Sequence, residues 1–432
     1  MKCLKGYLFL LVCILVLSGC TYLESAQEPS GDPSGNRSPV AFNPPGQFTA
    51  SGPLLYSDLS PSGRPGAAPV LDLSTDATLT LLFETEGFDS GEYILSFTHH
   101  NPDWSRSSLP PEFFLDGLFE IYLSGGELNR NDPFRYRQFT YRFPNRDVRF
   151  RVSGNYMLRI SDSQTGNLLF TLPFFVSENE GSLRAFTEQV LRAGNGRRFI
   201  HRPVAFFKAP DFVEMPQFDL QVLFSQNRYW GLTKVAGETD FSGNAEARFE
   251  LKSGDSFNGN FAAAAIDIRT LSQLEQDIDD LNPTQVPVTV QIDEDVENLY
   301  ADDGVSFPVP LSGALRTADA VYADASFYFE LRSGLNENQS VYLAGDFNNW
   351  HIEEKLKLGE PDNAGLRSVS VRIKQGRYRY KYILFDGEKF DLSRFENDFS
   401  GQRQDYHAFV YFRDPQTQSY RLLNVLNFRG PG

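Results

Sequence analysis

The chain has 432 residues, a formal net charge of −16 at pH 7, and three cysteines that all lie within its first 20 residues. The acidity keeps the protein soluble and argues against general binding of nucleic acids, which are themselves anionic. At about 150 residues per domain, a chain of this length predicts about three domains.

The first 20 residues have the layout of a lipoprotein signal peptide. Lys2 and Lys5 form a positive region, residues 8–17 are apolar, and small residues precede Cys20. This pattern predicts a signal peptide over residues 1–19 and attachment of acyl chains, such as palmitate, at Cys20. Because the other two cysteines leave with the signal, the mature chain has no internal disulfide. No later apolar run approaches the ~20 residues that a membrane-spanning helix needs.

Residues 20–67 are rich in Pro, Ser, Gly and Asn, and they contain few large apolar side chains. Such a segment buries too little surface to offset its ordering entropy, so we expect a flexible tether between the lipid and the folded body. Acidic runs after the lipidated cysteine mark surface export in some bacteria, and none follows Cys20. By this resemblance the body of the outer-membrane lipoprotein is expected to face the periplasm, with the cell surface as the alternative.

The rest of the chain predicts an all-β protein, because aromatic residues are abundant and apolar residues alternate with polar ones. We expect tandem β-sandwich domains. The first domain spans residues 68–178. Its aromatic alternation changes phase within residues 134–143, which predicts a β-bulge near Gln138. Residues 148–152 and 156–160 are expected to form a hairpin.

A second sandwich is expected over residues 179–313. Ser182 as a cap, Gly194 as a terminator, and Leu183, Phe186 and Val190 on one face predict a short helix. Residues 218–224 and 286–292 have strand patterns, and Pro287 would confine the later strand to a sheet edge. A second short helix is expected over residues 270–278.

The third domain is expected over residues 314–428. Residues 369–373 and 378–382 alternate between apolar and charged side chains, and Gln375-Gly376 lies between them. This pattern predicts a hairpin.

Few residues point to reaction chemistry. The five histidines show no metal-binding spacing, and no nucleophile elbow, phosphate loop or dinucleotide fingerprint is present. We therefore expect no catalytic site, no metal site and no cofactor, and a protein that is not an enzyme.

Two basic stripes stand out on this acidic chain, each on the outward phase of predicted strands. Either they are solubilising faces that discourage edge pairing, or they bind an anionic partner such as lipid headgroups, a sugar phosphate or acidic protein loops. The candidate partner-binding residues are Arg135, Arg137, Arg142, Arg149 and Arg151 in the first domain, and Arg372, Lys374, Arg377, Arg379 and Lys381 in the third.

Residues 345–350 (GDFNNW), 376–382 (GRYRYKY) and the Asp386-Gly387 turn resemble early-set modules that bind glycogen and starch. The resemblance implies tandem immunoglobulin-like domains of the early-set type, with this fold in the third domain, and it implies that Trp350 stacks on glucose. The position of the second sugar-stacking aromatic holds Glu388-Lys389-Phe390, and the closing asparagine-rich loop is absent. Two readings of Trp350 stay open, a carbohydrate-binding residue and a core or hinge aromatic.

A longer resemblance covers nearly all of the chain after the tether. It rests on residues 97–104 (FTHHNPDW), 114–117 (FLDG), 141–145 (YRFPN), 153–158 (SGNYML), 265–269 (AIDIR), 395–399 (FENDF) and 410–415 (VYFRDP). These blocks are similar to the plug protein family of the type IX secretion system. His100, where the family often has cysteine, departs from the pattern, as do the tether and the lipid attachment signal.

The family resemblance implies a non-enzymatic protein. Its partner would be a large outer-membrane β-barrel translocon, whose periplasmic mouth the protein closes when no cargo passes. The alternative is a lipoprotein that binds polysaccharide through Trp350 of the third domain.

Overall fold

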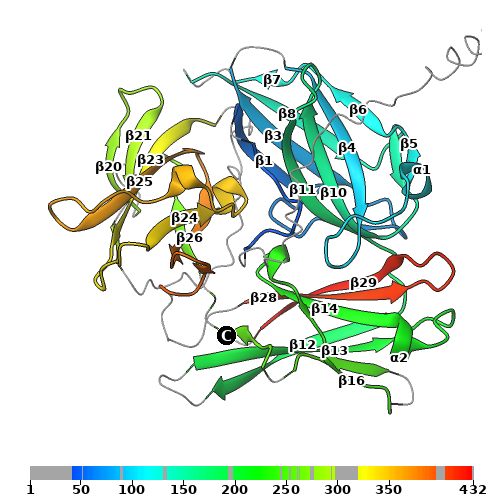
Figure 1. Ribbon diagram of the computed structural model, residues 1–432. Helices are drawn as coiled ribbons and strands as arrows, with labels where there is room; N and C mark the ends of the chain where they lie inside the picture. The colour runs from blue at the N-terminus through cyan, green and yellow to red at the C-terminus, as the bar shows by residue number, and fades with distance from the viewer. Residues whose placement is uncertain are drawn as a thin grey trace, which may run out of the picture. The chain divides into compact units, whose positions relative to one another are not determined.

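The computed structural model describes residues 41–50, 52–87, 91–129, 134–192, 198–243, 246–252, 254–259, 261, 263–272, 277–292, 294–296, 320–395 and 404–430. The predicted signal peptide, the lipid attachment at Cys20 and the first half of the predicted tether lie outside these residues. Residues 39–432 form one compact unit. It is built almost entirely of strands, which confirms the predicted fold class (Figure 1).

The first sandwich has two antiparallel sheets and a shared aromatic core. One sheet has the order β1-β3-β8-β7 and the other β2-β11-β10-β4-β6, where only the β2–β11 pair is parallel. Phe83 from the first sheet and Phe97 and Phe174 from the second are buried in one cluster. The bounds are β1 Leu54–Pro61, β3 Leu79–Glu86, β8 Tyr136–Phe143, β7 Glu127–Leu128, β2 Val70–Asp72, β11 Leu168–Ser177, β10 Gly154–Asp162, β4 Tyr93–His100 and β6 Glu120–Leu123.

Strand β8 contains no bulge toward β3, so the bulge predicted near Gln138 is wrong. The two strands pair in unbroken register from Tyr136 to Phe143. The phase change has another cause, because the first residue of β8 is buried on the face opposite to that of Phe139 and Phe143. Phe139 and Phe143 enter the core of the first sandwich, whereas Tyr136 packs on Tyr322 with ring centroids 5.0 Å apart. The burial of Tyr136 on the second face of β8 therefore explains the change of aromatic phase that predicted an inserted residue.

The hairpin predicted for residues 148–160 is also wrong. Strand β9 (Val148–Phe150) pairs with the short strand β5 (Leu115–Gly117), which follows the single helical turn α1 (Pro111–Phe114). Strand β10 instead pairs with β11 and β4. Strands β9 and β10 both direct apolar side chains into the core of the first sandwich, although they belong to different sheets. The alternation of apolar residues therefore did not show whether the two strands pair with each other.

The second sandwich combines segments that lie far apart in the sequence. Its sheets have the orders β12-β13-β17-β16, with β18 beside β13, and β15-β14-β28-β29. The bounds are β12 Ser182–Arg192, β13 Arg198–Lys208, β17 Ala247–Glu250, β16 Glu238–Asp240, β18 Phe257–Asn258, β15 Lys234–Val235, β14 Leu220–Gln226, β28 Asp405–Arg413 and β29 Tyr420–Arg429, with α2 Pro216–Asp219 and the 3₁₀ turn η1 Trp230–Leu232.

The helix predicted from Ser182 to Gly194 is a strand, β12, which pairs with β13 along its whole length. Leu183 packs against the core, while Phe186 and Val190 are exposed on the opposite face. The spacing of Leu183, Phe186 and Val190 resembled one face of a helix only because two apolar residues of this strand are exposed on its outer face.

The third sandwich has the sheets β19-β26-β24, with β27 beside β26, and β20-β21-β23-β22, with β25 beside β23. Its core includes side chains from both sheets. The bounds are β19 Ala264–Asp267, β26 Arg377–Phe385, β24 Ser340–Gly345, β27 Phe390–Asp391, β20 Ile278–Asn282, β21 Val288–Ile292, β23 Tyr322–Glu330, β22 Asp295–Val296 and β25 Leu366–Lys374, with the 3₁₀ turns η3 Asp346–Asn348 and η4 Glu354–Leu356.

Strands β25 and β26 do not form the predicted hairpin. Strand β25 pairs with β23, and β26 pairs with β19 and β24, so Gln375-Gly376 carries the chain from one sheet to the other. Ile373 and Tyr378 then meet across the core from opposite sheets. An arch of this kind has the same alternation and turn residues as a hairpin, but its apolar faces point at each other.

Two other expectations for residues 270–292 also change. Ile278 begins strand β20 rather than extending a helix, while residues 273–276 of the predicted helix lie outside the described part of the chain. Strand β21 is an inner strand between β20 and β23, so the edge position predicted from Pro287 is wrong. Pro287 directly precedes the first residue of β21, where its missing N–H costs no ladder hydrogen bond.

Strand pairing divides the chain differently from the predicted limits. The third sandwich occupies residues 264–395, and β28 and β29 then return to pair with β14 of the second sandwich. The third sandwich is thus an insertion between strands of the second. Within residues 20–67, where a tether was predicted, residues 54–61 form β1 and Phe42 is buried.

Candidate functional site

The basic stripe of the third sandwich lies against other parts of the same chain. Lys374 is 5% exposed and pairs with the fully buried carboxylate of Glu84 on β3. The Tyr322 hydroxyl donates to the same carboxylate (2.5 Å). Burial raises the pKa of Glu84, and the Lys374 ammonium partly offsets this rise. This group connects the first and third sandwiches.

The neighbouring cations of this stripe also have partners within the chain. Arg372 pairs with Asp324 at 2.8 Å and lies over the Phe134 ring. Lys381, which is 5% exposed, lies 3.9 Å from the centroid of the Phe261 ring. Arg377 lies opposite Asp267 in the β19–β26 pair. These contacts occupy the side chains that the sequence indicated for an external partner.

The remaining cation of this stripe, Arg379, makes two hydrogen bonds of 3.0 Å to Asp346 of η3. The indole Nε1 of Trp350 donates to the same carboxylate at 2.9 Å. Trp350 is only 8% exposed, because Phe42 and Tyr229 cover its ring with centroids 5.2 and 4.9 Å away. Of the two readings left open for Trp350, the geometry favours the core aromatic.

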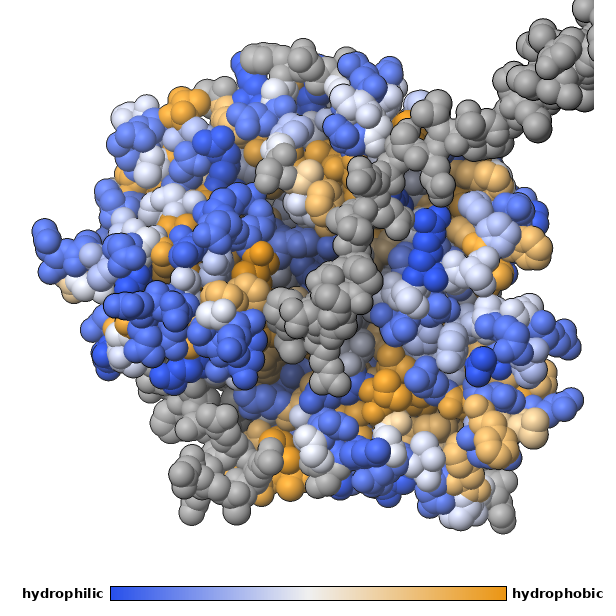
Figure 2. Space-filling view, in the orientation of Figure 1, coloured by the Kyte–Doolittle hydropathy of each residue, from blue (hydrophilic) through white to orange (hydrophobic). Residues whose placement is uncertain are grey.

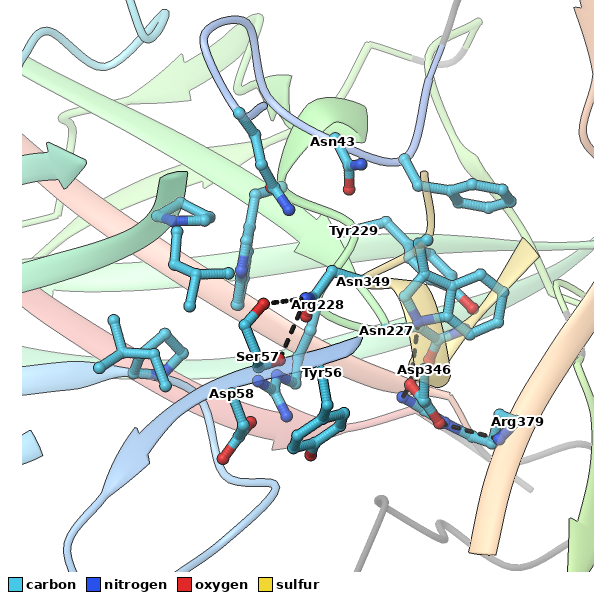
Figure 3. Close-up of a pocket in the computed structure, with 18 residues that line it drawn as sticks. Asn43, Tyr56, Ser57, Asp58, Asn227, Arg228, Tyr229, Asp346, Asn349 and Arg379 are labelled. Atoms are coloured by element: carbon cyan, nitrogen blue, oxygen red, sulfur yellow. Dashed lines mark hydrogen bonds and ion pairs between the residues drawn. The ribbon is translucent and has the colours of Figure 1, made fainter. Parts of the chain in front are cut away.

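A small cavity lies beside this cluster, where the 41–50 segment, β1, residues 227–230 and η3 meet (Figure 3). Its volume is about 80 Å³, below the roughly 300 Å³ of the smallest typical ligand pockets. Asp58 and Arg228 line it, and burial raises the pKa of Asp58 while Arg228 partly offsets this. The cavity has room for water molecules but not for a sugar ring.

The basic stripe of the first sandwich is more accessible. Arg137 donates to the Gly126 carbonyl at 2.7 Å and Arg135 to that of Asn129 at 3.4 Å. Arg142 and Arg149 are exposed. Arg151 is exposed too, and it pairs with Asp116 at 2.8 Å in the neighbouring strand β5.

Exposed apolar side chains lie in α1, in β6 and between β5 and β6, close in the chain to β5, the strand that pairs with β9. Phe113 (62% exposed) lies in α1 beside β5, and β5 pairs with β9 so that Asp116 lies opposite Arg149. Figure 2 shows apolar residues at the surface in this region among hydrophilic ones. We call this area the β5–β9 surface; it comprises Phe113, Leu118, Phe119, Tyr122, Arg149 and Arg151.

Sequence reasoning missed the apolar half of the β5–β9 surface. The signal was present, because Ile121 and Leu123 are the buried phase of β6 and Tyr122 therefore points outward. An exposed aromatic at that phase, beside Leu118 and Phe119, is the pattern of a contact surface.

Four of the five histidines are buried inside the sandwiches. His99 is buried, its Nδ1 lies 2.8 Å from the Ser107 hydroxyl, and burial lowers its pKa to about 4. His407, also buried, has a pKa lowered to about 3 by burial. Within the described residues, no group of three or more His, Cys, Asp or Glu side chains is arranged to hold a metal ion. No helix among the described residues is long and apolar enough to cross a membrane.

Comparison with protein families gives one match. Residues 57–178 match the model of the type 9 secretion system plug protein 1st domain. The match confirms the resemblance to the plug family for this part of the chain, supports a role in type IX secretion, and includes the whole β5–β9 surface. It also begins inside β1, in the segment predicted as tether. The likeness to glycogen-binding modules stays a prediction.

Comparison with solved structures shows the fold alone. A hypothetical protein from Parabacteroides merdae has a TM-score of 0.81 and 19% identity, covering 90% of this chain and 100% of that one. The C-terminal domain of the antigen I/II-family protein AspA of Streptococcus pyogenes has 7% identity over 87% of this chain and 99% of its own, with a TM-score of only 0.16. No curated protein matches the sequence.

Proposed function

We propose that this protein is a non-enzymatic lipoprotein of type IX secretion that closes the periplasmic side of the outer-membrane β-barrel translocon. The match of residues 57–178 to the plug domain carries the proposal. A broad rigid body suits the closure of a wide aqueous pore and needs no reactive group. Acyl chains on Cys20 would hold the body at the membrane and raise its local concentration near the barrel, so modest contacts suffice.

Contact with the translocon is assigned to the β5–β9 surface. The third-sandwich cations are engaged within the chain, whereas Arg149 and Arg151 are exposed. Phe113 and Tyr122 are also exposed, on elements that lie close in the chain to β5, the partner strand of β9. Interface centres are rich in aromatic side chains, and arginine is enriched with them. Acidic loops of the translocon would meet the two arginines, and apolar groups would cover the rings.

The charge reversals Arg149→Glu and Arg151→Glu, made together, should lower recovery of the translocon with this protein about fivefold or more near 0.15 M salt. The loss arises because two favourable contacts become repulsive. Recovery is the amount of translocon that co-purifies with the affinity-tagged protein from solubilised native membranes. The double change Phe113→Ala and Tyr122→Ala should also lower recovery, but by a factor that salt leaves unchanged.

A matched control is the pair Arg332→Glu and Arg413→Glu, which changes the net charge equally on exposed arginines outside the first sandwich. Its recovery should equal that of the unchanged chain. If all three double variants recover the translocon equally, the contact is elsewhere. If the unchanged chain recovers no translocon at all, the proposed function itself is wrong.

Polysaccharide binding, the alternative that the sequence left open, is disfavoured by the covered ring of Trp350. We expect α-glucans up to millimolar concentration to leave the tryptophan fluorescence of the protein unchanged, because no glucose ring can stack on the buried indole. The titration is compared with cellulose fragments of equal length. A saturable change specific to α-glucan would return this function to consideration.

A further inference from the structure

Strand β12 forms one edge of its sheet, and it also contacts β29 of the facing sheet. It spans Ser182–Arg192 and pairs with β13 on one side, and no other strand of the described residues pairs with it on the other side. Its register with β13 is unbroken, so no bulge twists the edge away. The strand contains neither lysine nor proline, two residues that often protect such an edge, although it does contain Arg184 and Glu188.

The outward face of β12 is partly apolar. Phe186 and Val190 are 44% and 40% exposed on this face, and Leu191 near the end of the strand is 51% exposed. Phe186 stacks loosely on Phe206 of β13, with centroids 6.2 Å apart. Open backbone groups beside exposed rings are the features that accept an added strand.

The charge pattern of the edge is complementary to itself. Arg184, Phe186 and Glu188 occupy successive positions on the outward face. If a second β12 runs antiparallel with Phe186 opposite its own copy, Arg184 lies opposite Glu188 of the other chain, and the reverse pair forms by symmetry. Opposite charges directly across an antiparallel pair are stabilising, as are paired aromatic rings.

The contacts that Arg184 and Glu188 make within the chain do not use all of their polar atoms. Arg184 uses Nε and Nη2 for Glu246, at 3.1 and 2.8 Å. Glu188 uses Oε2 for Arg202 at 2.6 Å, and its Oε1 has only a longer contact of 3.7 Å to Arg248.

We propose that a second copy of this chain pairs with β12 through its own β12, in an antiparallel register centred on Phe186. The two four-stranded arrays β12-β13-β17-β16 then become one continuous sheet across a two-fold axis. The interface is isologous, so each contact occurs twice. Pairing covers this edge and buries Phe186. It does not use the β5–β9 surface, and the experiment below does not require the translocon.

The register is tested with single cysteines in the mature chain, residues 20–432, with Cys20→Ser, which contains no other cysteine. Directly opposed residues of an antiparallel pair have Cβ atoms about 4.5–5.5 Å apart, which mild movement brings to disulfide distance. A Phe186→Cys variant should therefore oxidise to a covalent dimer. Val190→Cys is the matched control, because its two copies lie roughly 27 Å apart in this register at ~3.4 Å per residue.

Self-association is measured by sedimentation of the same Cys20→Ser chain. The dimer should weaken about tenfold with Arg184→Glu, because two attractive pairs become two repulsive ones. Arg332→Glu, an exposed arginine outside this sandwich, should have no effect. A monomer at every concentration up to ~100 μM would overturn the proposal. Equal cross-linking of the two cysteine variants would overturn it as well, since random collision explains that result.

Discussion

A Lys374→Met variant is expected to lose about 3–5 kcal/mol of unfolding free energy, because it leaves the Glu84 carboxyl group buried without its cation, so the group must either stay charged or take up a proton, and both cost stability. Glu84 is fully buried and Lys374 is 5% exposed. The Tyr322 hydroxyl would still donate to the carboxylate but cannot neutralise it. The measurement is urea unfolding of the mature chain with Cys20→Ser, followed by circular dichroism.

The double variant Glu84→Gln and Lys374→Met should recover most of this loss. The amide that replaces the Glu84 carboxylate would carry no charge, and its oxygen could still accept the hydrogen bond from Tyr322. An Arg151→Met variant, which removes the exposed pair with Asp116, should cost less than about 1 kcal/mol. If Lys374→Met costs no more than Arg151→Met, the buried pair does not hold the first and third sandwiches together.

Sequence patterns predicted the class of the fold but not the connections between strands. Alternation along β10 and β26 correctly indicated strands, since period two follows from the pleat itself. The partner of each strand is set by contacts distant in sequence. The apolar faces of β25 and β26 suit a hairpin and an arch equally, and only the positions of β23 and β24 decide between them.

The same limit applies to the candidate site residues. Lys374 follows the buried Ile373, and Lys381 lies between the buried Tyr380 and Tyr382, so both a solvated face and a partner-binding face were consistent with the pattern. The structure shows a third arrangement. The outward side of the third sandwich packs against other parts of the same chain, where Lys374 pairs with Glu84 and Lys381 lies over Phe261. Tyr136 gave the one sequence signal of this contact, because its phase conflicts with that of Phe139.

Residues 41–50 illustrate how composition can hide order. The segment is rich in proline and polar residues and was predicted to be tether, yet it follows the first sandwich with backbone hydrogen bonds. The Ala50 N–H donates to the Leu169 carbonyl and the Thr171 N–H to that of Phe48, both at 2.8 Å. Farther along the segment toward the N-terminus, the Gly231 N–H donates to the carbonyl of Phe42 at 2.8 Å.

A Phe42→Ala variant is expected to lose about 3–5 kcal/mol of unfolding free energy, because the ring is 1% exposed and its removal leaves a cavity. The ring packs against Tyr229 of the second sandwich and Trp350 of the third, at 4.7 and 5.2 Å. Water should then reach the indole, so we also expect the tryptophan emission to shift to longer wavelength. Both effects are measured on the mature chain with Cys20→Ser.

Phe218→Ala is the matched control for Phe42→Ala, because Phe218 is 76% exposed and its loss leaves no cavity. It should change the unfolding free energy by less than about 0.5 kcal/mol. Equal stability of the two variants would mean that residues 41–50 are a tether after all. A loss confined to Phe42→Ala would mean that residues 41–50 are part of the folded body rather than of a tether, and that Phe42 stabilises the place where Tyr229 of the second sandwich and Trp350 of the third come together.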